Sequence, residues 1–279
     1  MSRTVTTPIR VPQRFWVGLA AAAVYVAGAA GVANLLTGAF PQSDPLADLA
    51  LGHFPVLIPL IVAGVLFVRW AGWRDQVWRA PAAFETTPRR WWLLAIPVLL
   101  LAQSVTVLVT MPADRWQLGV ILLVGAVTAL VGFGEELFFR GILRASIRAH
   151  HGETVTLIAT SLLFGAGHSI GSLMNGVPPG VIAFQVGVTA LDGAVLYGAF
   201  LATGRLWVPI VLHALDDFVL RVGGGVQSGP SSDVSLGPVS IAIEWTLWVL
   251  AIALLVSCIR RDVLARRAAH SAERTTSGS

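Results

Sequence analysis

The sequence contains no lysine, a single cysteine and few charged residues of either sign. Charged side chains make up 12% of its 279 residues, whereas hydrophobic residues make up 55%. A soluble domain carries roughly a quarter charged residues. The shortage of charge therefore excludes an ordinary water-soluble domain and predicts an integral membrane protein.

The basic residues are all arginine, and the formal net charge is +4. They lie in short clusters between apolar runs, as in the cytoplasmic loops of membrane proteins, and do not form a nucleic-acid-binding stripe. We therefore expect no nucleic-acid partner. The lone cysteine, Cys258, has no partner for an intrachain disulfide, and its apolar surroundings predict a structural role.

Eight apolar runs of about the length that crosses a bilayer follow one another along the chain. The first has a basic start, as a signal peptide does, but it is longer than the usual apolar core of roughly 7–15 residues, which favours a retained helix. The sequence therefore predicts an all-α fold, a polytopic membrane helix bundle with about eight transmembrane helices. The runs lie near residues 15–36, 49–68, 91–111, 116 to beyond 131, 155–170, 181–203, 206–222 and 239–258.

The connections between these runs differ in arginine content. The termini and the even-numbered connections hold the arginine clusters, whereas the odd-numbered connections hold Arg115 and Arg221 beside several aspartates. Because cytoplasmic loops are rich in arginine, we expect a multi-pass protein of the plasma (inner) membrane with both termini cytoplasmic. The predicted parts are a cytoplasmic N-terminal segment at 1–14, transmembrane helices 1–3 at 15–111, helices 4–8 at 112–262 with a core at about 116–222, and a disordered cytoplasmic tail at 263–279.

Two adjacent carboxylates, Glu135 and Glu136, lie in the fourth run. Ionisable groups in a bilayer cost roughly 2.5–3.5 kcal/mol each on insertion scales. Glu136 and Arg140 are four residues apart on one helix face and can form an ion pair, whereas Glu135 points elsewhere and is free to act as a base. A salt bridge at the helix end would explain Glu136 and Arg140 but would leave Glu135 unexplained.

Two further segments place histidines in apolar runs. His168 follows two glycines and an alanine, whose small size lets a neighbouring backbone or a substrate approach. His213 and Asp217 are four residues apart, so the acid can orient the imidazole or share an ion or a water with it. Each histidine alone is more often a packing residue, and Asp216, on another face, is interpreted as a helix-end contact.

Together the three segments hold the groups that activate water. Glutamate and histidine are the usual general bases, and histidine and carboxylates are also zinc ligands. If a metal is used, its predicted ligands are Glu135, His168, His213 and Asp217, and a metal-free mechanism is also open. Because each of these groups is costly on its own, we predict that they converge on one site.

These segments resemble the motifs of the CPBP family of intramembrane proteases, also called the CAAX prenyl protease 2 or Abi family. The resemblance covers about residues 131–217. Asp217 stands where better-known members often have asparagine, and the effect of the added charge stays open. The matching residues are Glu135, Glu136 and Arg140 for EExxxR, Phe164 and His168 for FxxxH, and His213 and Asp217 for HxxxN or HxxxD.

The resemblance implies an intramembrane endopeptidase, named as a metalloprotease, whose partners are the lipid bilayer and membrane-associated protein or peptide substrates. It implies that Glu135 takes a proton from water while His168 helps to hold that water. It implies that Glu136 and Arg140 fix the helix and can contact substrate. His213 and Asp217 would polarise the scissile carbonyl and stabilise its oxyanion.

Ideal helix lengths raise one difficulty. From residue 116, Glu135 lies about 28 Å along its helix, near the cytoplasmic end, whereas His168 lies about 22 Å along the next helix from residue 153. The two meet only if the fourth helix extends further, the fifth starts inside the core, or residues 141–152 dip into the membrane. We expect a site within the bilayer, among helices 4, 5 and 7, that opens to the cytoplasm.

Two other functions use similar residues. An ion- or proton-coupled transporter also uses buried acids and histidines, but it is expected to show internal repeats, and we find none in the sequence. A non-catalytic membrane immunity or scaffold protein of the same fold would tolerate the loss of the Glu135 carboxylate. Two further acids in apolar runs, Asp192 and Glu244, are interpreted as packing or interfacial groups.

Overall fold

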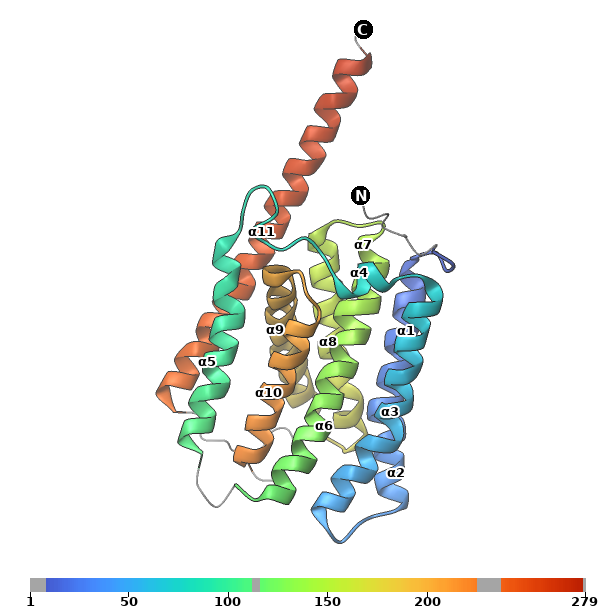
Figure 1. The fold of residues 1–279 in the computed structure, drawn as a ribbon, viewed down its shortest axis with the longest axis vertical. Helices are drawn as coiled ribbons and strands as arrows, with labels where there is room; N and C mark the ends of the chain where they lie inside the picture. The colour runs from blue at the N-terminus through green and yellow to red at the C-terminus, as the bar shows by residue number, and fades with distance from the viewer. Residues whose placement is uncertain (1–8, 112–115, 225–236, 278–279) are drawn as a thin grey trace, which may run out of the picture.

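Long helices lie side by side along one axis of the computed structural model, which describes residues 9–111, 116–224 and 237–277 (Figure 1). The predicted all-helical bundle is confirmed. Residues 1–8 of the predicted N-terminal segment lie outside the described residues. The α-helices are α1 (Phe15–Val26), α2 (Ala33–Ala39), α3 (Pro45–Ala71), α4 (Arg74–Trp78), α5 (Ala95–Thr110), α6 (Leu118–Glu136), α7 (Arg144–Arg148), α8 (Glu153–Met174), α9 (Pro179–Thr203), α10 (Trp207–Gly224) and α11 (Pro238–Ser277).

Seven helical stretches of the described residues are long and apolar enough to cross a membrane. Helix α10, the predicted seventh span, is not among them, because it carries Asp216, Asp217 and Arg221 within its 18 residues. Yet α1 begins and α11 ends at the same end of the bundle (Figure 1), which requires an even number of passes. Helix α10, packed against α5, α6 and α9, therefore completes eight passes through the bundle.

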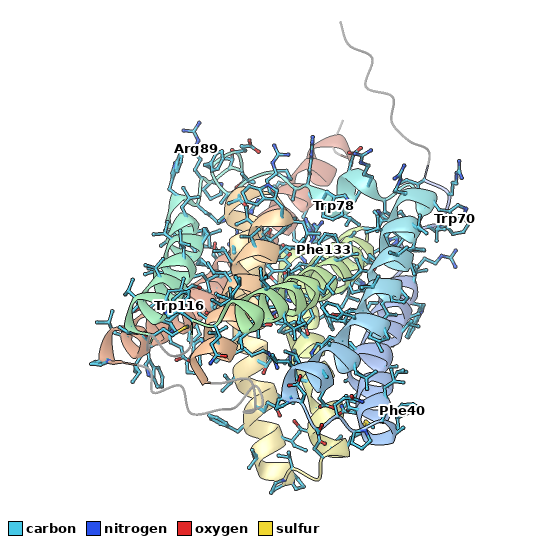
Figure 2. All side chains as sticks on the ribbon, turned by 60° about the horizontal axis from the view of Figure 1, so that its bottom comes forward. Phe40, Trp70, Trp78, Arg89, Trp116 and Phe133 are labelled. Carbon is cyan, nitrogen blue, oxygen red and sulfur yellow. The ribbon has the colours of Figure 1, made fainter. Side chains whose placement is uncertain are left out.

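The two ends of the bundle differ in charge. Arg69 near the end of α3, Arg89 before α5 and Arg148 at the end of α7 lie where α1 begins and α11 ends. We call this the arginine-rich end. Phe40, which follows α2, lies at the opposite, arginine-poor end (Figure 2). The alternation of the connections predicted from their arginine content thus corresponds to two ends of one bundle.

Helix α6 does not stop at the carboxylate pair. A π-helical stretch, η4 (Leu137–Leu143), joins it to α7, so that Leu118–Arg148 form one helical span of 31 residues. Glu135 therefore lies about 20 Å from the end of this span, well inside the bundle. Of the three predicted ways for Glu135 and His168 to meet, the structure uses the first, an extension of the fourth helix.

The segment that follows α3 packs over the arginine-rich end and forms backbone hydrogen bonds with the turn between α9 and α10. The Ala80 amide donates to the Gly204 carbonyl at 3.0 Å, and the Leu206 amide donates to the Trp78 carbonyl at 3.2 Å. Gly204 has a φ of 66°, and a Cβ at this position would overlap the Ala80 carbonyl oxygen. Glycine is needed here both for the left-handed turn and for the close approach.

The C-terminal helix differs from its prediction. Helix α11 continues to Ser277, although the sequence predicts a disordered tail from residue 263. The extension leaves the bundle and projects beyond its arginine-rich end (Figure 1). The physical cause of this extension is local. Residues 263–269 consist mainly of alanine, leucine and arginine, which are strong helix formers and extend the helix without tertiary contacts.

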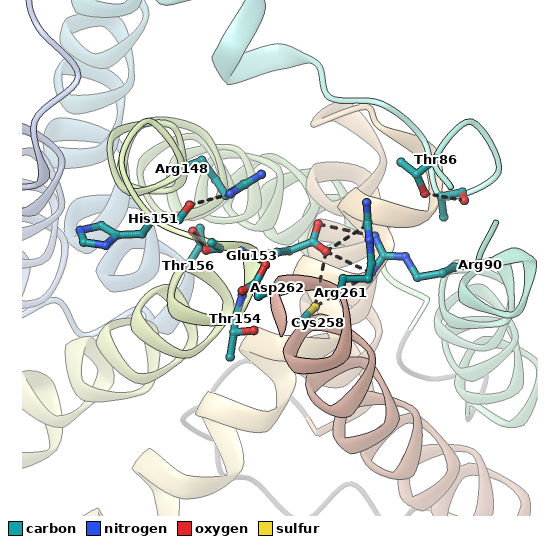
Figure 3. A network of polar contacts seen from close by, with 12 residues as sticks. Thr86, Arg90, Arg148, His151, Glu153, Thr154, Thr156, Cys258, Arg261 and Asp262 are labelled. Atoms are coloured by element: carbon teal, nitrogen blue, oxygen red, sulfur yellow. Dashed lines mark hydrogen bonds and ion pairs between the residues drawn. The ribbon is translucent and has the colours of Figure 1, made fainter. Parts of the chain in front are cut away.

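A polar network joins α11 to the start of α8 (Figure 3). The Glu153 carboxylate pairs with Arg90 at 3.1 Å and with Arg261 at 3.2 Å. The Asp262 carboxylate accepts from the amides of Glu153 at 3.1 Å and Thr154 at 2.9 Å. The α8 N-cap is a glycine without a side chain, so Asp262 supplies the missing cap from another helix.

We predict that Asp262→Ala lowers the free energy of unfolding by about 1 kcal/mol, because the first amides of α8 lose their acceptor. Thermal unfolding in detergent micelles measures the change. The control is Arg260→Ala, which removes an exposed charge two residues away on the same helix. Equal melting temperatures for the two variants would contradict the capping role.

Candidate active site

The two adjacent carboxylates occupy different environments. Glu136 is fully buried, and its Oε1 pairs with Arg140 Nη1 at 2.7 Å. The predicted i,i+4 ion pair is therefore present. The side chain of Glu135 is 16% exposed and lies outside this pair, so it is the carboxylate that water can reach. The fully buried Glu136 has the arrangement expected of the helix-fixing role that the resemblance implies.

Arg140 connects three helices. Beyond its pair with Glu136, its Nη2 donates to the Gly193 carbonyl of α9 at 3.0 Å. Its guanidinium lies 4.0 Å from the ring centroid of Phe164 on α8. A Cβ at residue 193 would be 3.3 Å from Nη2, so the glycine keeps this approach open. A fully buried arginine needs such partners, because an unpaired charge at this depth would be strongly destabilising.

The orientation of His213 depends on Glu136. Its Nδ1 lies 3.0 Å from Glu136 Oε1, and because that carboxylate is paired with arginine, Nδ1 is the donor. The sequence predicted that Asp217 could orient this ring, but Asp217 Oδ2 lies 3.7 Å from Nε2, beyond hydrogen-bond distance. The Nε2 atom is consequently directed toward Glu135 and Asp217.

The free carboxylate faces both histidines. Glu135 Oε2 lies 3.6 Å from His213 Nε2, and Oε1 lies 3.9 Å from His168 Nε2. His168 Nδ1 is 2.9 Å from the Phe164 carbonyl, to which it must donate, so Nε2 is the nitrogen that faces the carboxylate. These separations are too long for direct hydrogen bonds but suit groups that share a water beside them.

Small residues bring the site helices together. A Cβ at Gly132 would lie 2.8 Å from the Ala214 amide, so this glycine lets α6 approach α10. At Gly165 a Cβ would overlap the Val186 carbonyl of α9. Both glycines lie within one turn of a site residue, so close packing sets α6 against α10 and α8 against α9 beside the site.

Tyr25 of α1 is a site neighbour that the sequence reasoning missed. Its ring is buried and stacks on Phe138 at 4.7 Å between centroids, and its hydroxyl has no hydrogen-bond partner among the described residues. A Cβ at Gly134 would lie 2.6 Å from that hydroxyl, so Tyr25 lies directly against the residue before Glu135. Its polar hydroxyl in an otherwise apolar run was the available signal.

Three other acids lie in the helices of the bundle. Asp192 Oδ1 accepts a hydrogen bond from Trp248 Nε1 at 3.0 Å, in agreement with its predicted packing role. Asp216 lies in the middle of α10, so its interpretation as a helix-end contact is wrong. Glu244 lies near the start of α11.

The donor set has the chemistry of a zinc site but not its geometry. Zinc binds histidine nitrogens and carboxylate oxygens at about 2.0–2.2 Å, with all ligands directed at one point. Among the residues that the structure describes, no three His, Cys, Asp or Glu side chains are arranged to hold a metal ion. The four predicted ligands therefore do not fit a metal in this arrangement.

The site residues differ in exposure. His168 and Asp217 have side chains that are each 35% exposed, whereas Glu136 and Arg140 are at 0%. Along the bundle axis, Arg140 lies beyond Glu135 toward the arginine-rich end, and Asp217 lies beyond His213 toward the arginine-poor end. His168 and Asp217 are thus the more exposed members of the site, and Glu136 and Arg140 form its buried part.

Residues 116–219 match the model of the Rce1-like family, described as type II CAAX prenyl endopeptidase Rce1-like. The matched segment contains all six predicted site residues, and the match confirms the family resemblance predicted from the motifs. A search of the curated proteins finds no match for the chain.

We predict that Arg140→Leu destabilises the protein by roughly 3–5 kcal/mol, because it leaves the Glu136 carboxylate buried and unpaired. The double variant Glu136→Gln with Arg140→Leu should regain much of that loss, since neither charge remains. Thermal unfolding of both variants in the same lipid measures the coupling. A double variant less stable than Arg140→Leu would contradict the ion-pair explanation.

Proposed function

We propose, from the match of residues 116–219 to the Rce1-like family of type II CAAX prenyl endopeptidases, that the chain hydrolyses peptide bonds of membrane-associated proteins within the bilayer. The observation that carries the proposal is the convergence of Glu135, His168 and His213 from three helices, with each histidine Nε2 within 3.9 Å of a Glu135 carboxylate oxygen. We also propose the plasma (inner) membrane as the location, with the arginine-rich end in the cytoplasm.

In the proposed first step, Glu135 takes a proton from a water that His168 Nε2 also holds. The water oxygen forms a bond to the scissile carbonyl carbon, and the carbonyl π electrons move to its oxygen as an oxyanion. His168 Nε2 lies 3.9 Å from Glu135 Oε1, and Glu135 is the member of the adjacent carboxylate pair that arginine does not neutralise. A positioned general base contributes typically 10²–10⁴-fold to the rate, by order of magnitude.

His213 is the proposed donor to the oxyanion. Its Nδ1 donates to Glu136, so Nε2 is the atom left to face the substrate. Carboxylates of Glu135, Glu136 and Asp217 lie 3.0–3.7 Å from its two ring nitrogens and compensate a positive imidazolium. Asp217 adds a negative charge next to Nε2, where asparagine would add none.

In the second step, Glu135 gives the proton to the leaving nitrogen as the carbon–nitrogen bond breaks, and the oxyanion electrons re-form the carbonyl. The products are a new carboxyl group and a new amine. Glu136 and Arg140 are positioning residues in this scheme, because they are fully buried and act through His213.

We predict that Glu135→Gln and His168→Ala each lower peptide cleavage by at least about 10²-fold, because the base or the water ligand is lost. The assay uses purified protein in lipid with a peptide library. The matched control is Glu244→Gln, which removes another carboxylate of a membrane helix and should cleave like the wild type. Equal cleavage by all four proteins would remove the enzymatic proposal and favour the transporter or the non-catalytic scaffold.

Zinc, if bound, would be held by His168, His213 and the carboxylates of Glu135 and Asp217, and would supply a water of lowered pKa. Because these groups, although close together, are not arranged to hold a metal ion in the described structure, we propose water activation by glutamate and histidine without a metal.

We therefore predict that cleavage persists in the presence of metal chelators and that the purified protein contains much less than one zinc per chain. Chelator titration in the peptide assay, together with elemental analysis, tests both points. A chelator-dependent loss that zinc reverses, while a Glu135→Gln protein binds less zinc, would establish a metal site instead.

A further inference from the structure

We infer that Tyr25 of α1 is a positioning residue of the site, whose hydroxyl donates a hydrogen bond to the inner oxygen of the Glu135 carboxylate. This role rests on the proposed function, in which Glu135 is the general base, and adds the residue that holds the base in place. Tyr25 lies outside residues 116–219, which match the Rce1-like family. The N-terminal part of the chain thereby contributes to the site.

The two carboxylate oxygens of Glu135 differ in their surroundings. Oε1 lies 3.9 Å from His168 Nε2 and is the oxygen that shares the proposed water. Oε2 lies 3.6 Å from His213 Nε2, too far for a hydrogen bond, and it is buried with no hydrogen-bond partner among the described residues. A buried acceptor without a donor is costly. Oε2 therefore needs a donor that neither histidine supplies at these distances.

The Tyr25 hydroxyl is the complementary group. The residue is 2% exposed, and its hydroxyl also has no partner within the part of the chain that the structure describes. Its ring stacks on Phe138 with the centroids 4.7 Å apart, a contact that phenylalanine would make equally well. The chain has 12 phenylalanines and only 2 tyrosines, so packing explains the ring but not the hydroxyl. A buried phenol usually has a hydrogen-bond partner.

Helix packing places this hydroxyl beside the base. A Cβ on Gly134, the residue before Glu135, would lie 2.6 Å from the hydroxyl oxygen. A Cβ on Gly167, the residue before His168, would lie 3.1 Å from the side chain of Val26, the next residue of α1. The end of α1 therefore packs against both glycines that precede the base and the water-holding histidine.

The electrostatic environment of Tyr25 identifies the acceptor. Three carboxylates act on the hydroxyl, and Glu135 has a larger effect than Asp217 or Glu136. A phenolic O–H is a donor and an ionised carboxylate is an acceptor. A small rotation of the Glu135 side chain or one bridging water closes the remaining gap to Oε2. The bond fixes the carboxylate with Oε1 directed at the water, and the buried hydroxyl does not touch the substrate.

We predict that Tyr25→Phe lowers kcat for peptide cleavage by roughly tenfold and leaves KM unchanged, because the base loses the donor that orients it. The assay uses purified protein in lipid. Tyr197→Phe is the matched control, since it removes the other tyrosine hydroxyl, whose charged neighbours are Glu153 and Arg144, and it should cleave like the wild type. A kcat of Tyr25→Phe equal to that of the wild type, or an effect confined to KM, would contradict the role.

A spectroscopic measurement tests the hydrogen bond without cleavage. In the Tyr197→Phe protein Tyr25 is the only tyrosine, so tyrosine labelled with a carbon isotope at Cζ gives a single NMR signal in micelles. Glu135→Gln removes the charge of the acceptor and should move this signal. Asp217→Asn removes another carboxylate charge that acts on the hydroxyl, and should move the signal much less.

A signal that Glu135→Gln does not move, or that both substitutions move equally, would overturn the inference. The two measurements also separate this role from the proposed function. If the wild type cleaves no peptide while the signal responds selectively to Glu135→Gln, the enzymatic proposal fails and the hydrogen bond stands. If the wild type cleaves and Tyr25→Phe has the same kcat, the proposed function stands and the role of Tyr25 is wrong.

Discussion

The buried ion pair between Glu136 and Arg140 is the interaction on which the site depends. In a dry interior an unpaired charge would be strongly destabilising, so Glu136 and Arg140 must stay paired in the folded protein. Arg140 then reaches Gly193 on α9 and the face of Phe164 on α8, while Glu136 reaches His213 on α10. One pair thereby fixes four helices around Glu135, whose carboxylate stays free because its neighbour satisfies the arginine.

The features that were predictable from the sequence are those whose signals are local. Hydropathy and arginine content depend on short windows, so they identified the all-helical bundle and its alternating connections. Helical spacing assigned Arg140 to Glu136 and left Glu135 unpaired, as the structure has it. The cost of isolated polar groups in a bilayer predicted their convergence, and the distances of 3.6 and 3.9 Å agree with it.

Other features depend on tertiary contacts or on backbone detail that spacing does not encode. Asp217 has the right spacing to orient His213, but Glu136 from another helix makes the shorter contact. Spacing along the chain does not predict which of the two carboxylates lies closer to the ring. The π-helical continuation of α6 and the cap that Asp262 provides for α8 are of the same kind. Tyr25, 110 residues before Glu135 along the chain, reaches the site only through helix packing.

The charge of α10 follows from the residues that it brings to the site. A helix that carries His213 and Asp217 beside Glu135 cannot be apolar all round, so composition alone does not mark it as a membrane span. The free-energy cost of placing the polar side chains of α10 in the membrane is offset because α5, α6 and α9 pack around this helix and because Glu136 accepts a hydrogen bond from His213. That acceptor is itself fully buried and paired with Arg140, so the same ion pair that fixes the site helices also holds this polar helix within the bundle.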